Sequence, residues 1–199
     1  MDNSKTLFNG CTLWCVGWSL VLLAGLCVGC LGREPTDPRD IGMTPATPTL
    51  TPIEELGITG QPIEVDIASY RLVVDGLVDR PLSFSYRELL AYPAVTQVPR
   101  LDCPGFFVDY AEWTGPLVRT LLEEAGVQLQ ASKVTFYDGS GFPYRATLSL
   151  EEAQRDDTYL AHTLYGEPLP AEHGYPVRLV AGSMLGSSWV KWLFRVQVE

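Results

Sequence analysis

A single thiol is the side chain of this sequence best suited to chemistry. The chain has five cysteines, and four of them (Cys11, Cys15, Cys27 and Cys30) lie in an apolar amino-terminal stretch, so Cys103 stands alone in the globular part. It has no disulfide partner there, and a lone thiol in an oxidising compartment is a liability unless it is buried or bound. Two interpretations remain for Cys103, a buried core cysteine or a thiol that binds something.

Two cations and two histidines are the other candidates. Arg178 and Lys191 each lie in an otherwise apolar run. An unpaired charge is costly in such a run, so each is expected to have a partner. His162 and His173 are eleven residues apart in different predicted elements, which is an unfavourable arrangement for a zinc pair.

Charge and missing motifs exclude several functions. The chain has 24 acidic and 14 basic side chains, and its formal net charge is -10. Phosphate backbones repel such a chain, so nucleic acid is not expected as a partner. The sequence also lacks G-x-S-x-G, a Walker glycine loop and G-x-G-x-x-G, and its acidic doublets are typical of solvated surfaces.

The elements around Cys103 are short strands and short helices. The pattern predicts a strand over residues 95–103 that ends at Cys103, where the chain continues as PGFF. An Asp75-Gly76 turn is expected between two strands in residues 70–78. Further strands are predicted at residues 133–137, 143–150, 158–165, 175–181 and 191–198.

Three helices are predicted between these strands. Ser85 with Glu88, and Ser149 with Glu152, have the spacing of capping boxes. The strongest helix signal is TGPLVRTLLEEAGV, with Thr114 as N-cap and Gly126 as the carboxyl-terminal stop. Together these elements predict an α+β fold, a mixed β-sheet domain with short helices.

The amino-terminal part is expected to lie outside this domain. Residues 1–30 form a signal or anchor segment, because no charged side chain occurs from Thr6 to Gly32. LCVGC at residues 26–30 resembles a bacterial lipobox, which would make Cys30 a lipidated first residue. An uncleaved transmembrane helix and plain secretion are the alternatives. Residues 31–62 are rich in proline and indicate a linker, followed by the domain at 63–199.

Five segments, taken in order, resemble the molybdopterin domain of the sulfite oxidase family. They are LDCPGFF (101–107), EWTGPLVRTLLEEAGV, VTFYDGSGF, GEPLPAEHGYPVRLV (166–180) and GSSWVKWLFRVQV (186–198), and the likeness covers residues 70–199. The resemblance implies a sulfite-oxidase-type molybdopterin-binding fold with a molybdenum-molybdopterin cofactor. The family holds molybdenum by two pterin sulfurs and one protein thiolate, which falls on Cys103, and a soft thiolate suits such a site.

The same resemblance assigns the pterin contacts. Arg178 and Lys191 become the charged partners of the pterin, and His173 lies beside it. Main-chain groups of Ser188, Trp189, Val190 and Lys191 complete the predicted contacts. Tyr165 and Gly166, at the start of GEPLP, resemble the bacterial periplasmic methionine sulfoxide reductase branch of the family. The amino-terminal cofactor-contacting segment of that branch has no clear counterpart among residues 55–62.

The residues after Cys103 depart from the family. Sulfite oxidases have arginines there, whereas this chain has PGFFVDYAEW with Phe106, Phe107, Tyr110 and Trp113. The resemblance with this departure implies an oxidoreductase that moves an oxygen atom and two electrons to or from a small neutral S- or N-oxide. A membrane-tethered binding or scaffolding domain of the same fold that has lost the metal is the alternative function.

The expected setting is a cell membrane, with a lipid or helix as the anchor and the domain outside the cytoplasm. A membrane haem protein or a soluble cytochrome is the electron partner that the family implies. MDNSKTLFNG has no arginine pair for export of a folded, cofactor-loaded protein. Three options remain open. The protein uses another export route, it is exported without molybdenum, or the domain stays cytoplasmic on a helical anchor.

Overall fold

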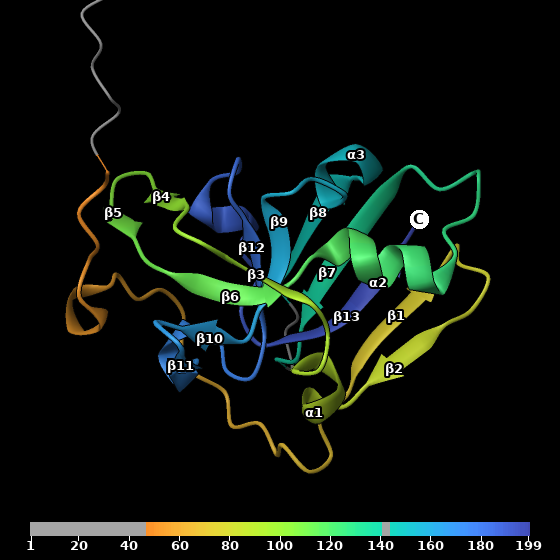
Figure 1. Cartoon of the computed structure of the whole chain (residues 1–199), viewed down its shortest axis with the longest axis horizontal. Helices are drawn as coiled ribbons and strands as arrows, with labels where there is room; N and C mark the ends of the chain where they lie inside the picture. Colours follow the sequence, from red (N-terminus) through yellow and green to blue (C-terminus); the bar gives the residue numbers. More distant parts are fainter. Residues whose placement is uncertain (1–46, 141–143) are drawn as a thin grey trace, which may run out of the picture. The chain divides into compact units, whose positions relative to one another are not determined.

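A five-stranded mixed sheet forms one half of the domain (Figure 1). In this computed structural model, which describes residues 47–140 and 144–199, the strand order is β2-β1-β13-β7-β8. The strands are β1 (Leu72–Gly76), β2 (Leu82–Phe84), β7 (Lys133–Asp138), β8 (Arg145–Ser149) and β13 (Leu193–Val198). Strand β1 runs parallel to β13 and the other neighbours are antiparallel.

Smaller sheets complete the β structure. A four-stranded sheet has the order β11-β10-β6-β3, with β3 (Ala94–Gln97), β6 (Trp113–Pro116), β10 (Thr163–Leu164) and β11 (Glu167–Pro168). Two strand pairs, β12–β9 and β4–β5, consist of β9 (Thr158–Ala161), β12 (Arg178–Ala181), β4 (Arg100–Cys103) and β5 (Phe107–Tyr110). The predicted α+β fold with mixed sheets is confirmed.

The helices are short, as the sequence indicates. They are α1 (Tyr86–Leu89), α2 (Val118–Ala125) and α3 (Leu150–Ala153), with 3-10 turns η1 (Ile53–Glu55), η2 (Ala171–His173) and η3 (Gly186–Ser188). Both predicted capping boxes form, at Ser85 and at Ser149. None of the helices in residues 47–140 and 144–199 combines the length and hydropathy needed to cross a bilayer. The predicted anchor segment, Cys30 included, lies outside the described residues.

Two local predictions were wrong for the same reason. Helix α2 begins at Val118 with Leu117 as N-cap, because the predicted N-cap Thr114 belongs to β6 and pairs with β3 and β10. Asp75 and Gly76 do not form a turn but end β1, where they pair with β13. A Cβ at Gly76 would lie 2.1 Å from the carbonyl oxygen of Val198. Pairing between distant strands thus overrides the local turn and cap signals.

Residues 51–61, here called the strap, pack on the domain although they were assigned to the linker. The N–H of Thr51 donates to the carbonyl of Tyr110 at 2.8 Å, and Leu56 is only 5% exposed within the hydrophobic core. Figure 1 shows this segment, in orange, passing beside β5. It was assigned to the linker because the residues before it are rich in proline, but its Leu56 and its backbone amides find partners in the domain.

Candidate functional site

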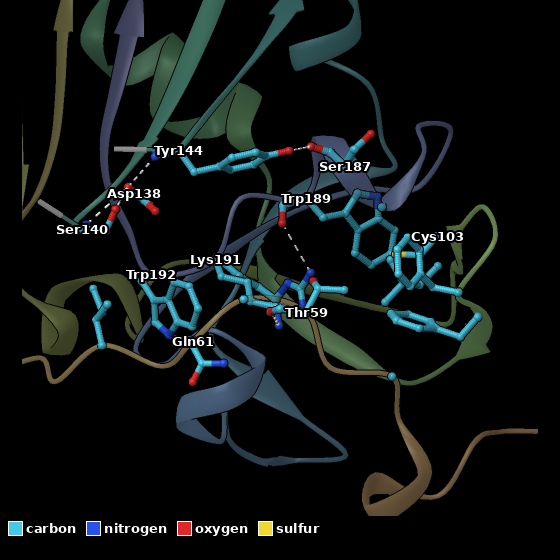
Figure 2. A pocket seen from close by; sticks show the side chains of 18 of the residues that line it. Thr59, Gln61, Cys103, Asp138, Ser140, Tyr144, Ser187, Trp189, Lys191 and Trp192 are labelled. Atoms are coloured by element: carbon cyan, nitrogen blue, oxygen red, sulfur yellow. Dashed lines mark hydrogen bonds between the residues drawn. The ribbon is translucent and has the colours of Figure 1, made fainter. Parts of the chain in front are cut away.

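Cys103 ends β4 and faces a pocket of about 620 Å³ (Figure 2). The thiol is free and half-buried. Strands β4 and β5 form the hairpin that positions it, with Cys103 paired to Phe107. Burial raises the pKa of the Cys103 thiol, and the positive charges of Arg178 and Lys191 oppose that rise.

Turn η3 lies directly against the thiol. A Cβ built on Gly186 would be 2.3 Å from Cys103 Sγ and 2.9 Å from Leu101 Cδ1, so only glycine fits at this position. Gly186, the first residue of the GSS sequence, therefore allows close packing against the thiol, and the sequence alone does not show this role. It brings the backbone of residues 186–188 to the side of the pocket where the thiol lies.

Arg178 is the most deeply buried cation of the site. Its side chain lines the pocket, is 2% exposed, and donates from Nη1 to the carbonyl of His173 at 3.1 Å. Its Cζ lies 4.7 Å from the ring centre of Trp113 and 5.5 Å from that of Trp189. Two aromatic faces thus stabilise the charge, and within the described residues neither a carboxylate partner nor an acceptor for Nε is present.

That unpaired Nε indicates a missing anion or acceptor. A buried donor without a partner costs about 1–3 kcal/mol, so such groups in native structures call for an explanation. Burial lowers the pKa of Arg178 to about 10, which leaves it fully charged at neutral pH. The guanidinium is therefore suited to a ligand that brings negative charge or acceptor atoms into the pocket.

Lys191 is the second cation that lines the pocket. Its Nζ donates to the carbonyls of Thr59 at 2.8 Å and of Glu172 at 2.6 Å, and lies 5.7 Å from the ring centre of Trp192. Burial, followed by the charge of Arg178, lowers the pKa of Lys191 to about 8. The lysine joins the strap on one side to turn η2 on the other.

His173 is buried behind these cations. Burial, with the nearby charges of Arg178 and Lys191, lowers its pKa to about 4, so the imidazole is neutral at pH 7. A neutral ring can donate one hydrogen bond and accept another. His173 does not itself line the pocket, and neither do Ser188 and Val190, whereas Cys103, Arg178, Trp189 and Lys191 do.

Three polar residues of the pocket were missed by the sequence interpretation. Asp138, which ends β7 and is 9% exposed, accepts at Oδ1 from the amide and hydroxyl of Ser140 and from the amide of Tyr144. The hydroxyl of Tyr144 donates to the carbonyl of Ser187 in η3. Figure 2 shows Cys103 and Asp138 on opposite sides of the pocket in that view. The DGSG sequence at a strand end was the available signal.

The strap supplies a further side of the pocket. Gly57, Thr59, Gly60 and Gln61 line it together with Ile63. The sequence interpretation found no counterpart of the family's amino-terminal cofactor-contacting segment among residues 55–62, whereas the structure places four of these residues at the pocket.

The aromatic residues after Cys103 divide into two groups. Phe106, which is 83% exposed, and Phe107 line the pocket. Tyr110 lies outside the pocket, and Trp113 is buried in the core beneath Arg178. His162 is also buried away from the pocket, and neither ring nitrogen has a partner among the described residues.

The fold is a mixed-sheet domain, and one thiol and two cations line its pocket. Comparison with known proteins shows which class of protein has these features. The model of the oxidoreductase molybdopterin binding domain matches residues 59–199. The chain is 32% identical to a sulfite oxidase of Gallus gallus over 68% of its own length and 36% of that protein. It is 30% identical to the oxidoreductase YuiH of Bacillus subtilis over 68% of each chain.

Two further relatives point the same way. The putative protein-methionine-sulfoxide reductase subunit YedZ1 of Azospira oryzae is 33% identical over 65% of this chain and 49% of that protein. The crystal structure of the sulfane dehydrogenase SoxCD from Paracoccus pantotrophus matches with a TM-score of 0.65 and 30% identity, covering 68% of this chain and 39% of that one. The chain spans half or less of three of these four relatives. It belongs to the family of molybdopterin-binding oxidoreductase domains.

Proposed function

We propose that this protein is a membrane-anchored molybdenum-dependent oxidoreductase whose substrate is a small neutral S- or N-oxide. The observation that carries the proposal is the pocket itself. A strand-end thiol, a buried guanidinium with an unpaired Nε and a half-buried ammonium line one cavity. Soft sulfur, fixed positive charge and unfilled donors match a cofactor that combines a metal, dithiolene sulfurs and a phosphate.

The chain's own residues would hold the cofactor as follows. Cys103 supplies a soft thiolate ligand to the metal, and Gly186 leaves the space in which that thiolate lies. Arg178 and Lys191 would supply positive charge, and the main chain of Trp189 and Lys191, which line the pocket, would supply hydrogen bonds to the pterin. Ser188, Val190 and the neutral His173 lie outside the lining, and His173 would act through Arg178, which donates to its carbonyl. When bound, the molybdenum cofactor supplies two-electron oxygen-atom transfer, and the protein contributes binding, orientation and electrostatics.

The charges around the pocket favour a neutral substrate. Arg178 and Lys191 are the cations among its described lining residues, and both are assigned above to the cofactor. Arg100 pairs with Asp102 on the same strand and does not line the pocket, and neither does Arg145. An anion would have to give up its hydration without a free cation to replace it. Phe106 and Phe107 offer apolar surface to a neutral oxide instead.

Metal analysis of the purified full-length protein is the first test. A molybdenum content near one atom per chain is expected, together with reduction of a neutral S- or N-oxide by artificial electron donors. Cys103→Ser should abolish that activity and change the spectrum of the metal while the protein stays folded, because it removes a soft ligand and little volume. A folded, metal-free wild-type protein would instead support the binding or scaffolding function.

Substrate charge is tested by comparing two kcat/KM values. Sulfite oxidation should be at least ~10-fold less efficient than reduction of the preferred neutral oxide, which corresponds to about 1.4 kcal/mol of transition-state stabilisation. Efficient sulfite turnover would contradict the neutral substrate. It would mean that a cation such as Arg100 or Arg145 reaches the site during turnover.

The anchor and the electron partner belong to the same proposal. Mass spectrometry of membrane-extracted protein should find a chain that begins at Cys30 and carries acyl groups. An intact Met1 would favour a helical anchor, and a soluble chain that begins elsewhere would favour secretion. A membrane haem protein or a cytochrome is the proposed electron partner, and its haem should change redox state when substrate is added to a reconstituted mixture.

A further inference from the structure

A hydrogen bond outside the pocket holds the part of the strap that lines the pocket. Asp109, on β5, is 5% exposed, and its Oδ2 accepts the backbone N–H of Gly57 at 2.8 Å. Asp109 is two residues beyond the pocket-lining Phe107, so both side chains project from the same face of the strand. The carboxylate itself does not line the pocket.

Gly57 is held against this hairpin with no space for a side chain. A Cβ at Gly57 would lie 2.2 Å from the ring of Phe107. The strap backbone therefore rests directly on the aromatic ring, and its amide points to Asp109. A hydrogen bond from an amide to a buried carboxylate is about twice as strong as one between neutral groups.

Among the described residues, the other hydrogen bonds between the strap and the domain lie on either side of Gly57, at Thr51 and at Thr59. Thr51 exchanges hydrogen bonds with the backbone of Tyr110, and Lys191 holds the carbonyl of Thr59. Asp109 binds the strap between Thr51 and Thr59, at Gly57, which is the first strap residue to line the pocket. Without the hydrogen bond to Asp109, the burial of Leu56 and the hydrogen bond from Lys191 would have to hold residues 57–61 in place. The proposed function also assigns Lys191 to the cofactor.

We infer that Asp109 is a positioning residue, whose carboxylate fixes the Gly57 amide and thereby seats residues 57–61 as one side of the cofactor pocket. The role of that side in cofactor retention rests on the proposed function. The seating of the strap does not, because it depends only on contacts within this chain.

Hydrogen exchange of the full-length protein in detergent, prepared without cofactor, tests the seating. Asp109→Ala should raise the exchange rate of strap amides by ~10-fold or more, because it removes a charged hydrogen-bond acceptor. Asp109→Asn, which keeps an acceptor oxygen, should raise it less. Glu112→Gln is the matched control, since it removes a nearby acidic charge whose side chain makes no hydrogen bond to the strap within the described part of the chain.

Molybdenum content of the protein purified from a cofactor-producing host is the second measurement. It should fall in the order wild type, Asp109→Asn, Asp109→Ala, and remain at the wild-type level in Glu112→Gln. If Asp109→Ala does not fold, Gly57→Ala disturbs the same seat and leaves the carboxylate in place, and it should accelerate strap exchange likewise.

The outcomes separate the two proposals. Unchanged strap exchange in a folded Asp109→Ala protein, or in Gly57→Ala where the former does not fold, overturns the positioning role. Where the wild-type protein does contain molybdenum, faster strap exchange with unchanged molybdenum content also overturns the positioning role, since the strap would then not be needed at the pocket. A wild-type protein that binds no molybdenum, with strap exchange still accelerated by Asp109→Ala, would refute the proposed function but leave the seating of the strap intact.

Discussion

Gly186→Ala is the substitution for which the structure gives the clearest expectation. The added Cβ would lie 2.3 Å from Cys103 Sγ and 2.9 Å from Leu101 Cδ1. An ordinary contact of 3.4 Å would require the sulfur to move by about 1.1 Å. The backbone of Gly186 is not in the left-handed region, so the effect is steric and not conformational.

Two consequences of this overpacking can be measured. Inserting a methyl group into a packed site costs about 1–3 kcal/mol, which for a chain of this size lowers the melting temperature by roughly 2–12 °C. Because the displaced atom is the proposed metal ligand, the molybdenum content of the purified protein should fall as well. Thermal unfolding and metal analysis of the same preparation report the two effects.

Gly105→Ala is the matched control. Gly105 lies in the hairpin beyond Cys103 with φ of +82°, and a Cβ there would meet nothing within 4 Å. It should lose about 1 kcal/mol of stability from backbone strain and none of its metal.

A double-mutant cycle sharpens the test of Gly186. In a Cys103→Ala background Gly186→Ala should be less destabilising, because the sulfur that it displaces is gone. Additive effects of the two substitutions, or a Gly186→Ala protein with full stability and metal, would refute the steric argument.

Three further predictions concern burial and charge. Folding stability should fall as the pH drops from 6.5 towards 4. Burial and the neighbouring cations lower the pKa of His173 to about 4 in the folded state, so the unfolded chain binds more protons in that window. Urea titrations at several pH values should show this dependence of the unfolding free energy on pH, and it should be weaker in His173→Gln. Trp113→Leu should cost about 3–5 kcal/mol from the cavity and the lost contact with Arg178, whereas Trp113→Phe should cost less because an aromatic face remains, and equal losses in chemical denaturation would contradict this. Asp75→Asn should cost less than about 1 kcal/mol, since the pair with Arg195 is partly exposed, and a larger loss in the same assay would show that the pair is more than a surface contact.

Much of the fold follows from local signals in the sequence. The two capping boxes and the Gly126 helix stop are encoded within a few residues, and all of them form. The single strand predicted over residues 95–103 is instead divided at Val98 and Pro99 into β3 and β4, because the two halves pair in different sheets, and only β4 ends at Cys103. The order of the segments around Cys103 and Arg178 also identifies the family, since motifs of this kind are read along the chain. Local patterns suffice here because caps and strand alternation depend on neighbours along the chain.

The tertiary structure decided what the pocket contains. The strap looked like linker, yet its Gly57 meets Asp109 across 52 residues and its Thr59 meets Lys191 across 132. Arg178 was expected to have a partner, but only the packed core shows that its partners are aromatic rings and a backbone carbonyl, which leave Nε without an acceptor among the described residues. Such contacts depend on how segments far apart in the chain pack together. The order of residue types does not show which backbone groups and ring faces will meet.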